Sequence, residues 1–393
     1  MKIAFTIFIL SLPSFFQITS PSSSKNIDCP IEKYKNESID ASTTLNDCID
    51  NAEKGAVIEI PPGKYKISQQ LKIRSSITIK TKVIRGSAPC SHKAEESCAV
   101  LLVGMLPSSE SGKMPIEIEG HNVVLQSLII QGGVDRSKVW EKRICLNDIH
   151  RPLAGGIRVK GDSFHMANVV LRNFSCYTAL EVMAGVKGLS VTDSLIGPNG
   201  QHDTLMMWAD GITVHDAASA VIQNNTFLDN TDVQLIFGGC TECIVKNNSF
   251  RHSSSFKRAS FAELMLHAWS NTSGNFSGSV TSQNKIDCGR SRRCGYGIMI
   301  GGEPWYPAKT FGGTVSANKV SNAQLGINVD HLTGGMTIQG NSVTMSGGMA
   351  NSDCGHRVWP AINVSKESRN FLTTDIKDEV NIETRGCLLN RNQ

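Results

Sequence analysis

The chain has 393 residues, of which 40% are hydrophobic, and a formal net charge of +4. This mild charge argues against a nucleic-acid binder, which would carry a clear basic stripe, and it is compatible with an acidic substrate. The apolar content suffices for an extended core.

The first residues have the pattern of a secretory signal peptide. Met1-Lys2 precedes an apolar run from Ile3 to about Phe16, and small polar residues follow. One early charge, a short apolar segment and small residues behind it predict a signal peptide over residues 1–24. The run is too short to span a bilayer comfortably, and no second run of this kind follows. We therefore expect a secreted or extracytoplasmic, soluble, monomeric protein without a membrane span.

Twelve cysteines are many for a protein of a reducing compartment. Together with the export signal they predict disulfide bonds. Local spacing favours two pairs, Cys90 with Cys98 and Cys288 with Cys294. The Cys-x-x-Cys pair at 240–243 suits redox chemistry, a metal or a structural disulfide. No second such pair and no His pair accompanies it, which favours the structural role.

A helix and then short strands open the mature chain. The segment from Thr43 to Lys54 has its apolar residues on one helical face, and Gly55 ends it. These apolar residues are Leu45, Cys48, Ile49 and Ala52. A strand with the sequence Val-Ile-Glu-Ile and the turn Pro-Pro-Gly-Lys-Tyr follow at 57–65. We expect the helix to cover the open end of a stack of coils, because a first coil has no neighbour to bury it.

Two short phrases recur through the rest of the chain. The first contains an Asn next to a turn and ends at apolar residues spaced by 23, 36, 34 and 23 positions: Phe227, Phe250, Ile286, Val320 and Val343. A spacing near 23 is typical of one bare turn of a β-helix, and longer spacings indicate loop insertions. The repeated Asn suits side-chain ladders and left-handed backbone conformations. No helix-period segment separates the strands, which argues against a globular α/β fold.

The sequence therefore predicts an all-β fold, a right-handed parallel β-helix with a short N-terminal capping helix. We expect one domain after the signal peptide, with a cap over about 25–55, coils over about 56–366 and a tail over about 367–393. The segments 131–154, 251–261 and 271–278 depart from the repeats. Long loops on a repeat scaffold tend to gather on one side and form the binding face.

The second phrase marks strands whose apolar residues point inward and whose neighbours point outward. Aligning its copies gives one outward column: Arg158, Thr213, Gln234, Met265, Met299 and Asn328. The position just after each strand gives another: Lys160, His215, Ile236, His267, Gly301 and Asp330. Like positions on neighbouring coils lie about 4.8 Å apart, so these residues become surface neighbours. From these columns we take His267 as a candidate catalytic residue and His215 and Gln234 as candidate substrate-binding residues.

Carboxylates gather at the ends of two of these strands. Asp210 precedes one strand, Asp232 precedes the next, Asp229 lies in the turn before it, and Asp216 follows the strand of His215. Such a cluster suits an acid/base pair for sugar chemistry or an oxygen-ligand site for Ca²⁺. Ordinary turn chemistry is the alternative, because Asp is common at strand ends. We predict Asp210 and Asp232 as catalytic and Asp229 and Asp232 as calcium ligands.

Arginines and tryptophans complete the set of candidates. The predicted disulfide loop 288–294 holds Arg290, Arg292 and Arg293, which could clamp carboxylates with planar bidentate contacts or form a solvated turn. Trp269 and Trp305 flank strands of the same column. Exposed Trp faces stack on sugar rings, although buried Trp is more common.

The helix, strand and Pro-Pro-Gly-x-Tyr opening resembles the cap and first coil of the pectate-lyase-like β-helix superfamily. Asp210-Gly-Ile-Thr-Val resembles the Asp-Gly-Ile-Ser-Ile strand of the pectate lyases, and the arginine-containing stretch 288–297 resembles their Arg-x-Pro-x-x-Arg segment. The resemblance implies Arg290 as the base that removes the proton α to a uronate carboxyl, and Asp232 as a calcium ligand. Arg292 stands at the family's proline, and Ile236 at its second calcium-binding Asp.

The same stretch resembles the polygalacturonase-type hydrolases, in which Asn-Thr-Asp and Asp-Asp lie on adjacent coils. Asp210 and the triplet Asn230-Thr-Asp232 stand in similar places, whereas the Asp-Asp, Gly-His-Gly and Arg-Ile-Lys motifs are absent. The resemblance implies Asp210 and Asp232 as acid and base acting on water.

These observations lead to three hypotheses. The first is an extracellular polysaccharide lyase that cleaves a uronic-acid-containing polymer by β-elimination, with Arg290 and Arg293 among its catalytic residues and calcium as a cofactor. The second is a glycoside hydrolase with paired aspartates. The third is a non-catalytic β-helix that binds glycans or serves at a surface. Each takes a polysaccharide as its partner.

Overall fold

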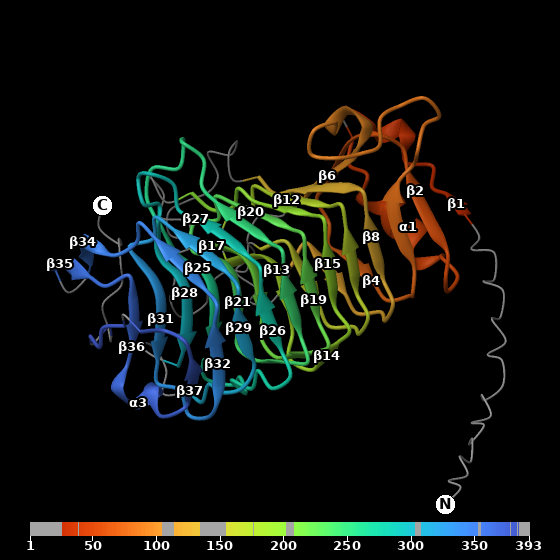
Figure 1. Ribbon diagram of the computed structural model, residues 1–393. Helices are drawn as coiled ribbons and strands as arrows, with labels where there is room; N and C mark the ends of the chain where they lie inside the picture. Colours follow the sequence, from red (N-terminus) through yellow and green to blue (C-terminus); the bar gives the residue numbers. More distant parts are fainter. Residues whose placement is uncertain are drawn as a thin grey trace, which may run out of the picture.

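Three long sheets wrap around one core in the computed structural model, which describes residues 26–37, 39–103, 114–133, 155–175, 177–201, 208–302, 308–352, 355–377, 379–382 and 384. Each complete coil contributes one strand to each sheet, and the coils stack from the end that carries α1 to the end that carries α3 (Figure 1). The predicted fold class, a right-handed parallel β-helix, is confirmed.

We call the sheets A, B and C in the order in which the chain enters them. Sheet A has twelve strands: β1 (Asn26–Asp28), β2 (Val57–Ile60), β5 (Thr78–Thr81), β8 (Val124–Gln126), β11 (His165–Ala167), β15 (Ser190–Thr192), β19 (Val221–Gln223), β23 (Ile244–Lys246), β26 (Val280–Ser282), β29 (Thr314–Ser316), β32 (Met336–Gln339) and β37 (Leu372–Thr374).

Sheet B has ten strands: β3 (Gly63–Ile67), β6 (Ala99–Val103), β9 (Leu128–Gln131), β12 (Val170–Arg172), β16 (Leu195–Ile196), β20 (Thr226–Leu228), β24 (Ser249–Arg251), β27 (Lys285–Asp287), β30 (Lys319–Ser321) and β33 (Ser342–Thr344). Sheet C also has ten: β4 (Leu71–Ile73), β7 (Ile116–Ile118), β10 (Ile157–Val159), β13 (Tyr177–Val182), β17 (Ala209–Val214), β21 (Val233–Phe237), β25 (Ser260–His267), β28 (Cys294–Gly301), β31 (Leu325–Asp330) and β36 (Ile362–Val364).

Smaller elements lie at the corners and ends. A short parallel ladder joins β14 (Val186–Lys187), β18 (Ala217–Ala218) and β22 (Cys240–Thr241), and an antiparallel hairpin joins β34 (Gly348–Ser352) and β35 (Gly355–Trp359). The helices are η1 (Glu32–Tyr34), α1 (Ser42–Asp50), η2 (Glu95–Ser97) and α3 (Lys366–Arg369). No helix in the described ranges is long and apolar enough to cross a bilayer.

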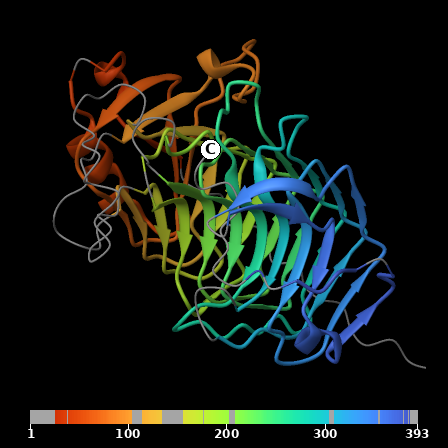
Figure 2. The ribbon, with the colours of Figure 1, turned by 90° about the vertical axis from the view of Figure 1, so that its left-hand side faces the viewer.

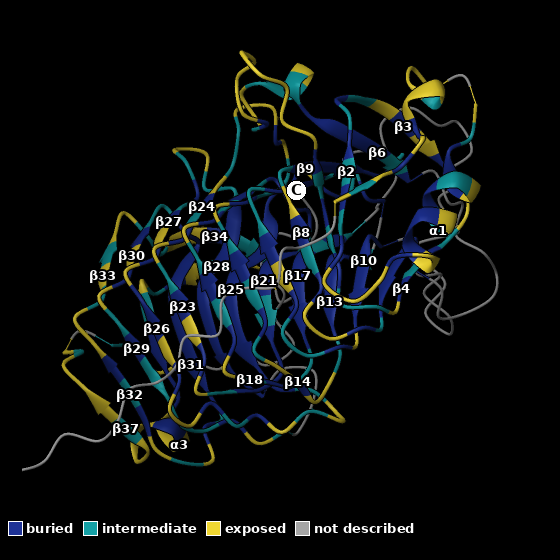
Figure 3. Ribbon diagram, turned by 90° about the vertical axis from the view of Figure 1, so that its right-hand side faces the viewer, coloured by how far each residue is buried: buried dark blue, intermediate teal, exposed yellow. Residues whose placement is uncertain are grey.

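The alternation of residues along each strand builds the core. Inward residues of successive coils are paired in register, as Ile212 is with Leu235, and they form one continuous apolar cluster along the axis. Phe227 and Phe250 stack with ring centroids 4.7 Å apart on adjacent coils. Burying such a side chain contributes about 2–3 kcal/mol, which a single coil could not collect alone. Figure 3 shows this buried interior beneath exposed loops.

The cap helix forms where the sequence predicted a helix, although α1 ends at Asp50 instead of Lys54. Its buried residues Leu45 and Ile49 join the main core. A disulfide between Cys29 and Cys48 ties it to the preceding segment. The helix therefore covers the first coil, as expected from its apolar face.

A ladder of buried asparagines fixes the turn between sheets A and B. The side-chain oxygen of each Asn accepts hydrogen bonds from the backbone N–H and the side-chain amide of the Asn one coil earlier, at 2.9–3.0 Å. The members are Asn225, Asn248, Asn284, Asn318 and Asn341. Asn224 and Asn247, just before two of them, have φ near +60°. Both predictions made for the repeated Asn are thus confirmed.

Disulfides join Cys90 to Cys98, Cys288 to Cys294 and Cys240 to Cys243, as predicted. Within the described ranges every cysteine is paired. The sulfurs of the 240–243 pair are buried, which agrees with the structural role expected for them. Such pairing is typical of proteins from oxidising compartments.

Two of the three expected loop segments belong to the corner between sheets B and C. The segment 131–154 connects β9 to β10 and 251–261 connects β24 to β25, whereas 271–278 connects sheet C to sheet A. The described coils can be followed from another side in Figure 2. Most of the inserted sequence therefore lies in connections that lead from sheet B into strands of sheet C.

Candidate functional site

Charged side chains form a row on the outer face of sheet C. Parallel pairing puts Glu117, Arg158, Glu181 and Thr213 at equivalent positions of four successive coils. Their strand neighbours point into the apolar core, so this row points outward. Even so, Glu117, Arg158 and Glu181 are 5%, 9% and 2% exposed. Charges buried to this extent require partners.

Arg158 supplies those partners. Its Nε lies 2.5 Å from Glu181 Oε2, and one terminal nitrogen lies 3.9 Å from Glu117 Oε1. The Lys160 ammonium lies 3.5 Å from the other Glu117 oxygen, and its side chain is 42% exposed. The row is therefore charge-balanced inside, and Lys160 is its cation nearest to solvent.

Glu181 stands at the centre of this network. Its Oε1 accepts a hydrogen bond from the Tyr177 hydroxyl and lies 3.0 Å from His215 Nε2. Burial alone would raise the pKa of Glu181, but the hydrogen bonds from His215 and Tyr177 and the charge of Arg158 outweigh it and hold the pKa below its ordinary value. The same burial, with the Glu181 charge, raises the pKa of Tyr177, so this phenol stays protonated.

The backbone at Tyr177 is unusual. Its φ is +72°, a left-handed conformation that aromatic residues rarely adopt. Such conformations cost on the order of 1–3 kcal/mol and are concentrated at functional sites. In this conformation the Tyr177 hydroxyl donates its hydrogen bond to Glu181.

His215 is the group of this network best placed for acid–base chemistry. Its side chain is 24% exposed, and with Nε2–H donating to Glu181 the other nitrogen, Nδ1, keeps its lone pair. Nδ1 has no hydrogen-bond partner among the described residues. The Trp269 ring packs against the imidazole in a T-shaped arrangement, with ring centroids 5.4 Å apart and an interplanar angle of 73°. A carboxylate that orients a partly exposed imidazole is the arrangement of a general base.

The predicted aspartates lie beside this network. Asp210 and Asp232 are on adjacent coils, where the Asp232 N–H donates to the Ala209 carbonyl. Asp210 accepts hydrogen bonds at both oxygens, from Thr213 Oγ1 at 2.9 Å and from the Val233 N–H at 3.0 Å. At the far end of its strand Asp216 accepts from Ser273. Asp210 thus ties two coils together.

Asp229, a predicted calcium ligand, has protein partners at both carboxylate oxygens. One of its oxygens accepts from the Ser253 N–H and the other from the Ser253 hydroxyl, and His252 Nδ1 lies 3.2 Å from the first. Among the described residues no group of three or more His, Cys, Asp or Glu side chains could hold a metal ion. Calcium as a cofactor stays a prediction.

A second histidine–carboxylate cluster lies at the corner between sheets B and C. His252 is fully buried between Asp229 and Glu263, with Nε2 2.9 Å from Glu263 Oε1. Ser260 Oγ lies 3.2 Å from the same nitrogen and donates to Glu263 at 2.6 Å. Burial alone would lower the pKa of His252, but the Glu263 charge and the hydrogen bonds to both carboxylates raise it to about 9. This protonated, inaccessible imidazole is a structural clamp.

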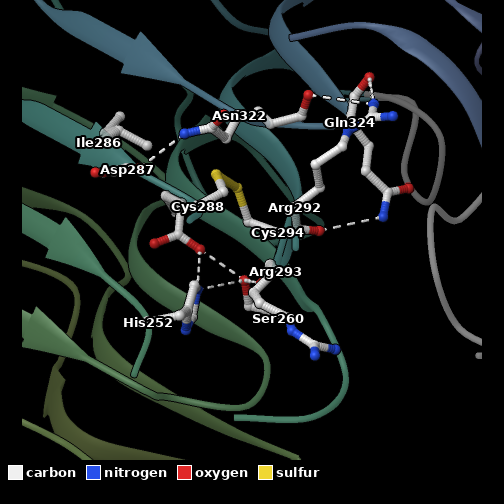
Figure 4. Close-up of a disulfide and its surroundings, with 12 residues drawn as sticks. His252, Ser260, Ile286, Asp287, Cys288, Arg292, Arg293, Cys294, Asn322 and Gln324 are labelled. Atoms are coloured by element: carbon white, nitrogen blue, oxygen red, sulfur yellow. Dashed lines mark hydrogen bonds and ion pairs between the residues drawn. A yellow bond between two sulfur atoms is a disulfide. The ribbon is translucent and has the colours of Figure 1, made fainter. Parts of the chain in front are cut away.

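The arginine loop lies next to that clamp, not next to Glu181 (Figure 4). The backbone carbonyl of Arg293 accepts from the N–H of Ser260 at 3.0 Å. Arg292 donates to the carbonyls of Met349, Ala323 and Gln324, and burial lowers its pKa. Arg290 is exposed. Because β28 is three coils from β17, the loop is about 14 Å along the axis from Asp210.

The remaining candidates are placed as follows. Strand β21 pairs Ile236, not Gln234, with Thr213, so the predicted outward column is wrong at this coil. Gln234 is buried and hydrogen-bonds Asn230. The strand contains two overlapping apolar-x-apolar triplets, Val233–Leu235 and Leu235–Phe237, and the predicted column was aligned on the first of them. His267 is also buried, at 1% exposure. Trp305 lies outside the described residues.

Glu181 and Tyr177 were missed by the sequence reasoning. Their strand, Tyr-Thr-Ala-Leu-Glu-Val, lacks the glycine that marks the other copies of the phrase. The usable signal was distance, because Glu181 follows Arg158 by 23 residues, which is one bare coil. Arg158 and Lys160 had been placed in the outward columns but had been given no role.

Comparisons with known proteins agree with this fold. A family model described as a right-handed beta helix region matches residues 143–303. No curated protein matches the sequence. An exopolygalacturonase from Thermotoga maritima is 10% identical over 93% of this chain and 95% of that chain, with a TM-score of 0.55.

Two further structures are similar. An alginate lyase from Paenibacillus sp. str. FPU-7 is 16% identical over 81% of this chain and 95% of that chain, with a TM-score of 0.51. The surface adhesin PfbA from Streptococcus pneumoniae is 12% identical over 86% of this chain and 94% of that chain, with a TM-score of 0.51. At such identities the likeness concerns the fold, and it agrees with the right-handed parallel β-helix expected from the sequence.

Proposed function

We propose that this protein is an extracytoplasmic polysaccharide lyase that cleaves a uronic-acid-containing polymer at the outer face of sheet C. The observation that carries the proposal is the pair formed by His215 and Glu181, in which a buried carboxylate orients a partly exposed imidazole. The similarity of the fold to an exopolygalacturonase and an alginate lyase supports a polysaccharide as the substrate.

In the proposed reaction His215 Nδ1 removes the proton from C5 of the uronate, next to the carboxyl group. The electron pair of that C–H bond forms the C4–C5 double bond, and the C4–O4 bond breaks. The imidazolium then returns the proton to the departing O4, so that one residue serves first as base and then as acid. Such proton transfers typically contribute about 10²–10⁴-fold in rate.

The other residues prepare this step. Glu181 accepts the hydrogen bond from His215 Nε2 and so holds the imidazole in one tautomer and orientation. Arg158 and Tyr177 act through Glu181 and are positioning residues. Lys160, the cation nearest to solvent, neutralises the uronate carboxylate whose charge grows as C5 loses its proton. Trp269 offers a ring face to a sugar beside His215.

The two other hypotheses have less support from the geometry. A hydrolase would use Asp210 and Asp232, but both oxygens of Asp210 accept hydrogen bonds from its own and the neighbouring coil. A non-catalytic glycan binder would share the fold of the adhesin. It would have no need for a partly exposed imidazole with a buried carboxylate behind it.

One assay separates these three functions. The protein is incubated with polygalacturonate, alginate and other acidic glycans, and both ultraviolet absorbance and reducing ends are followed. A lyase creates a C4–C5 double bond that absorbs in the ultraviolet, whereas a hydrolase yields reducing ends without it. Reducing ends alone would establish the hydrolase, and binding without either signal would establish the non-catalytic protein. A parallel reaction with a chelator tests the predicted calcium dependence.

A further inference from the structure

A group of exposed cations lies on the outer side of sheet B, on a different face from the Glu181 network. It consists of Arg251 on β24, Lys285 on β27, Lys319 on β30 and Arg290 in the disulfide loop that follows β27. All four are exposed. We call them the sheet B patch.

The register brings these charges close together. Lys285 and Lys319 are directly paired on adjacent strands, so their side chains start about 4.8 Å apart. Arg251 is paired with Asp287, two residues beyond Lys285. Like charges directly opposite one another in a sheet are destabilising. The folded chain therefore bears a cost here that an anionic ligand would remove.

The protein itself neutralises the patch only in part, through Asp287, which lies directly opposite Arg251 in the sheet. None of its four cations forms an ion pair with a described residue. Asp287 is the nearest acid in the register, and it accepts hydrogen bonds from the Gly289 N–H at 3.0 Å and the Asn322 side chain at 3.1 Å. Burial opposes the ionisation of Asp287, but these bonds and the charge of Lys285 keep its pKa low, so its single negative charge faces the four cations of the patch.

The sequence composition shows how unusual this region is. From Arg251 to Lys319 the chain has nine Lys and Arg but only three Asp and Glu, a net charge of +6. The complete chain carries only +4. The positive charge of the protein is thus concentrated in three coils and is offset elsewhere.

We infer that the sheet B patch is a binding site for a carboxylate-bearing polysaccharide, separate from the site at His215. Its cations repeat along the axis at steps of about 4.8 Å, so an extended chain with a charge on every sugar can contact several of them at once. Arginine guanidinium groups match carboxylates with two parallel hydrogen bonds. Disulfides on both sides of the fold suit a compartment where the anionic polymers are glycans.

This site does not depend on the proposed catalysis. It lies on sheet B at β24, β27 and β30, whereas His215 follows β17 of sheet C. A polymer held there would stay near the enzyme between cleavage events, and a protein without lyase activity would still bind it.

The test measures binding of polygalacturonate and alginate oligomers by calorimetry, in the full-length protein and in R251Q/K285Q/R290Q/K319Q. We expect this variant to bind the oligomers at least about tenfold more weakly than the wild type does. Binding by the wild type should weaken as salt is added, because exposed charges are screened beyond about 8 Å at physiological ionic strength. The matched control is K54Q/K93Q/K187Q/K377Q, which removes four exposed lysines elsewhere and should bind like the wild type.

Two further measurements complete the test. The patch variant should unfold at the same temperature as the wild type or a higher one, because the apposition of Lys285 and Lys319 is relieved. His215→Ala should retain polymer binding even though its lyase activity is lost. Equal binding by the patch and control variants, no binding of uronate oligomers by the wild type, or equally strong binding of a DNA duplex would each overturn the inference.

Discussion

Two histidine–carboxylate clusters of this protein use the same residue types for opposite purposes. His215 has one carboxylate partner, Glu181, and a side chain that is 24% exposed. His252 has two carboxylate partners, Asp229 and Glu263, and a side chain with no exposed surface. One cluster faces outward from sheet C, and the other fills the corner between sheets B and C.

The difference shows which surroundings make a histidine of this fold reactive and which make it structural. A histidine between two buried carboxylates stays protonated and cannot accept a proton at neutral pH. The connectivity from Asp229 through His252 to Ser260 matches that of a nucleophilic triad, yet its protonated imidazole and buried hydroxyl rule out that role. A single carboxylate partner, with the second nitrogen toward solvent, leaves an imidazole able to react.

Replacing His215 should give the largest effect. We expect His215→Ala to lower kcat/KM by about 10³-fold, equivalent to about 4 kcal/mol, because the general base is lost. The unfolding temperature should stay close to that of the wild type, since the side chain is at the surface of its network. Full activity of this variant would assign the base elsewhere, and Arg290→Ala provides the comparison with the arginine-base hypothesis.

The corresponding change at the clamp should act on stability instead. His252→Ala leaves Asp229 and Glu263 buried without their shared cation, and breaking a buried pair in this way costs about 3–5 kcal/mol. Denaturant unfolding measures the loss. At low temperature the folded fraction should keep its kcat, and a loss of kcat without a loss of stability would contradict the structural role.

The clamp should also make stability depend on alkaline pH. The pKa of His252 is about 9 in the folded protein and about 6.5 ordinarily, so its stabilisation is complete below about 6.5 and is lost as pH rises through 9. The contribution is on the order of 3 kcal/mol. His252→Gln should remove this dependence, which unfolding curves between pH 6 and 10 would reveal, whereas parallel curves for the two proteins would exclude the linkage.

The smallest effect is expected at Tyr177. Tyr177→Phe removes one of the hydrogen bonds that keep Glu181 ionised, so kcat should fall about tenfold and KM should change little. The pH–rate profile should shift at the same time, because the pKa of Glu181 rises. A change in KM alone would place Tyr177 in substrate binding, and an unchanged pH–rate profile would dissociate it from Glu181.

Much of the architecture could be predicted from periodicity. The coils could be predicted from the spacing of five apolar residues, and the ladder from the repeated Asn, because both patterns come from contacts between like positions of successive coils. The five residues are Phe227, Phe250, Ile286, Val320 and Val343. The capping helix followed from its apolar face, and two disulfides followed from short loops.

The chemistry was harder to predict because it depends on exact register. A shift of two residues in the alignment of β21 replaces Gln234 by Ile236 in the outward column. Alternation alone cannot distinguish the two alignments, because a two-residue shift keeps every side chain on the same face. Glu181 belongs to no sequence motif. Its role follows from its contacts with Arg158 on the preceding coil and with His215 on the next one. The clamp at His252 joins residues of two connections, Asp229 and His252, to Glu263 on strand β25, and no local pattern records this.

The asparagine ladder has a consequence for how such a protein can evolve. Successive members are 23, 36, 34 and 23 residues apart, yet their hydrogen bonds are equally short, at 3.0 Å from backbone N–H to side-chain oxygen. Thirteen residues can thus be added to a coil without changing where the next one begins. Insertions and deletions are absorbed between ladder members, so descendants of this gene can exchange whole loops beside sheet C while the strands that carry Glu181 and His215 keep their alignment.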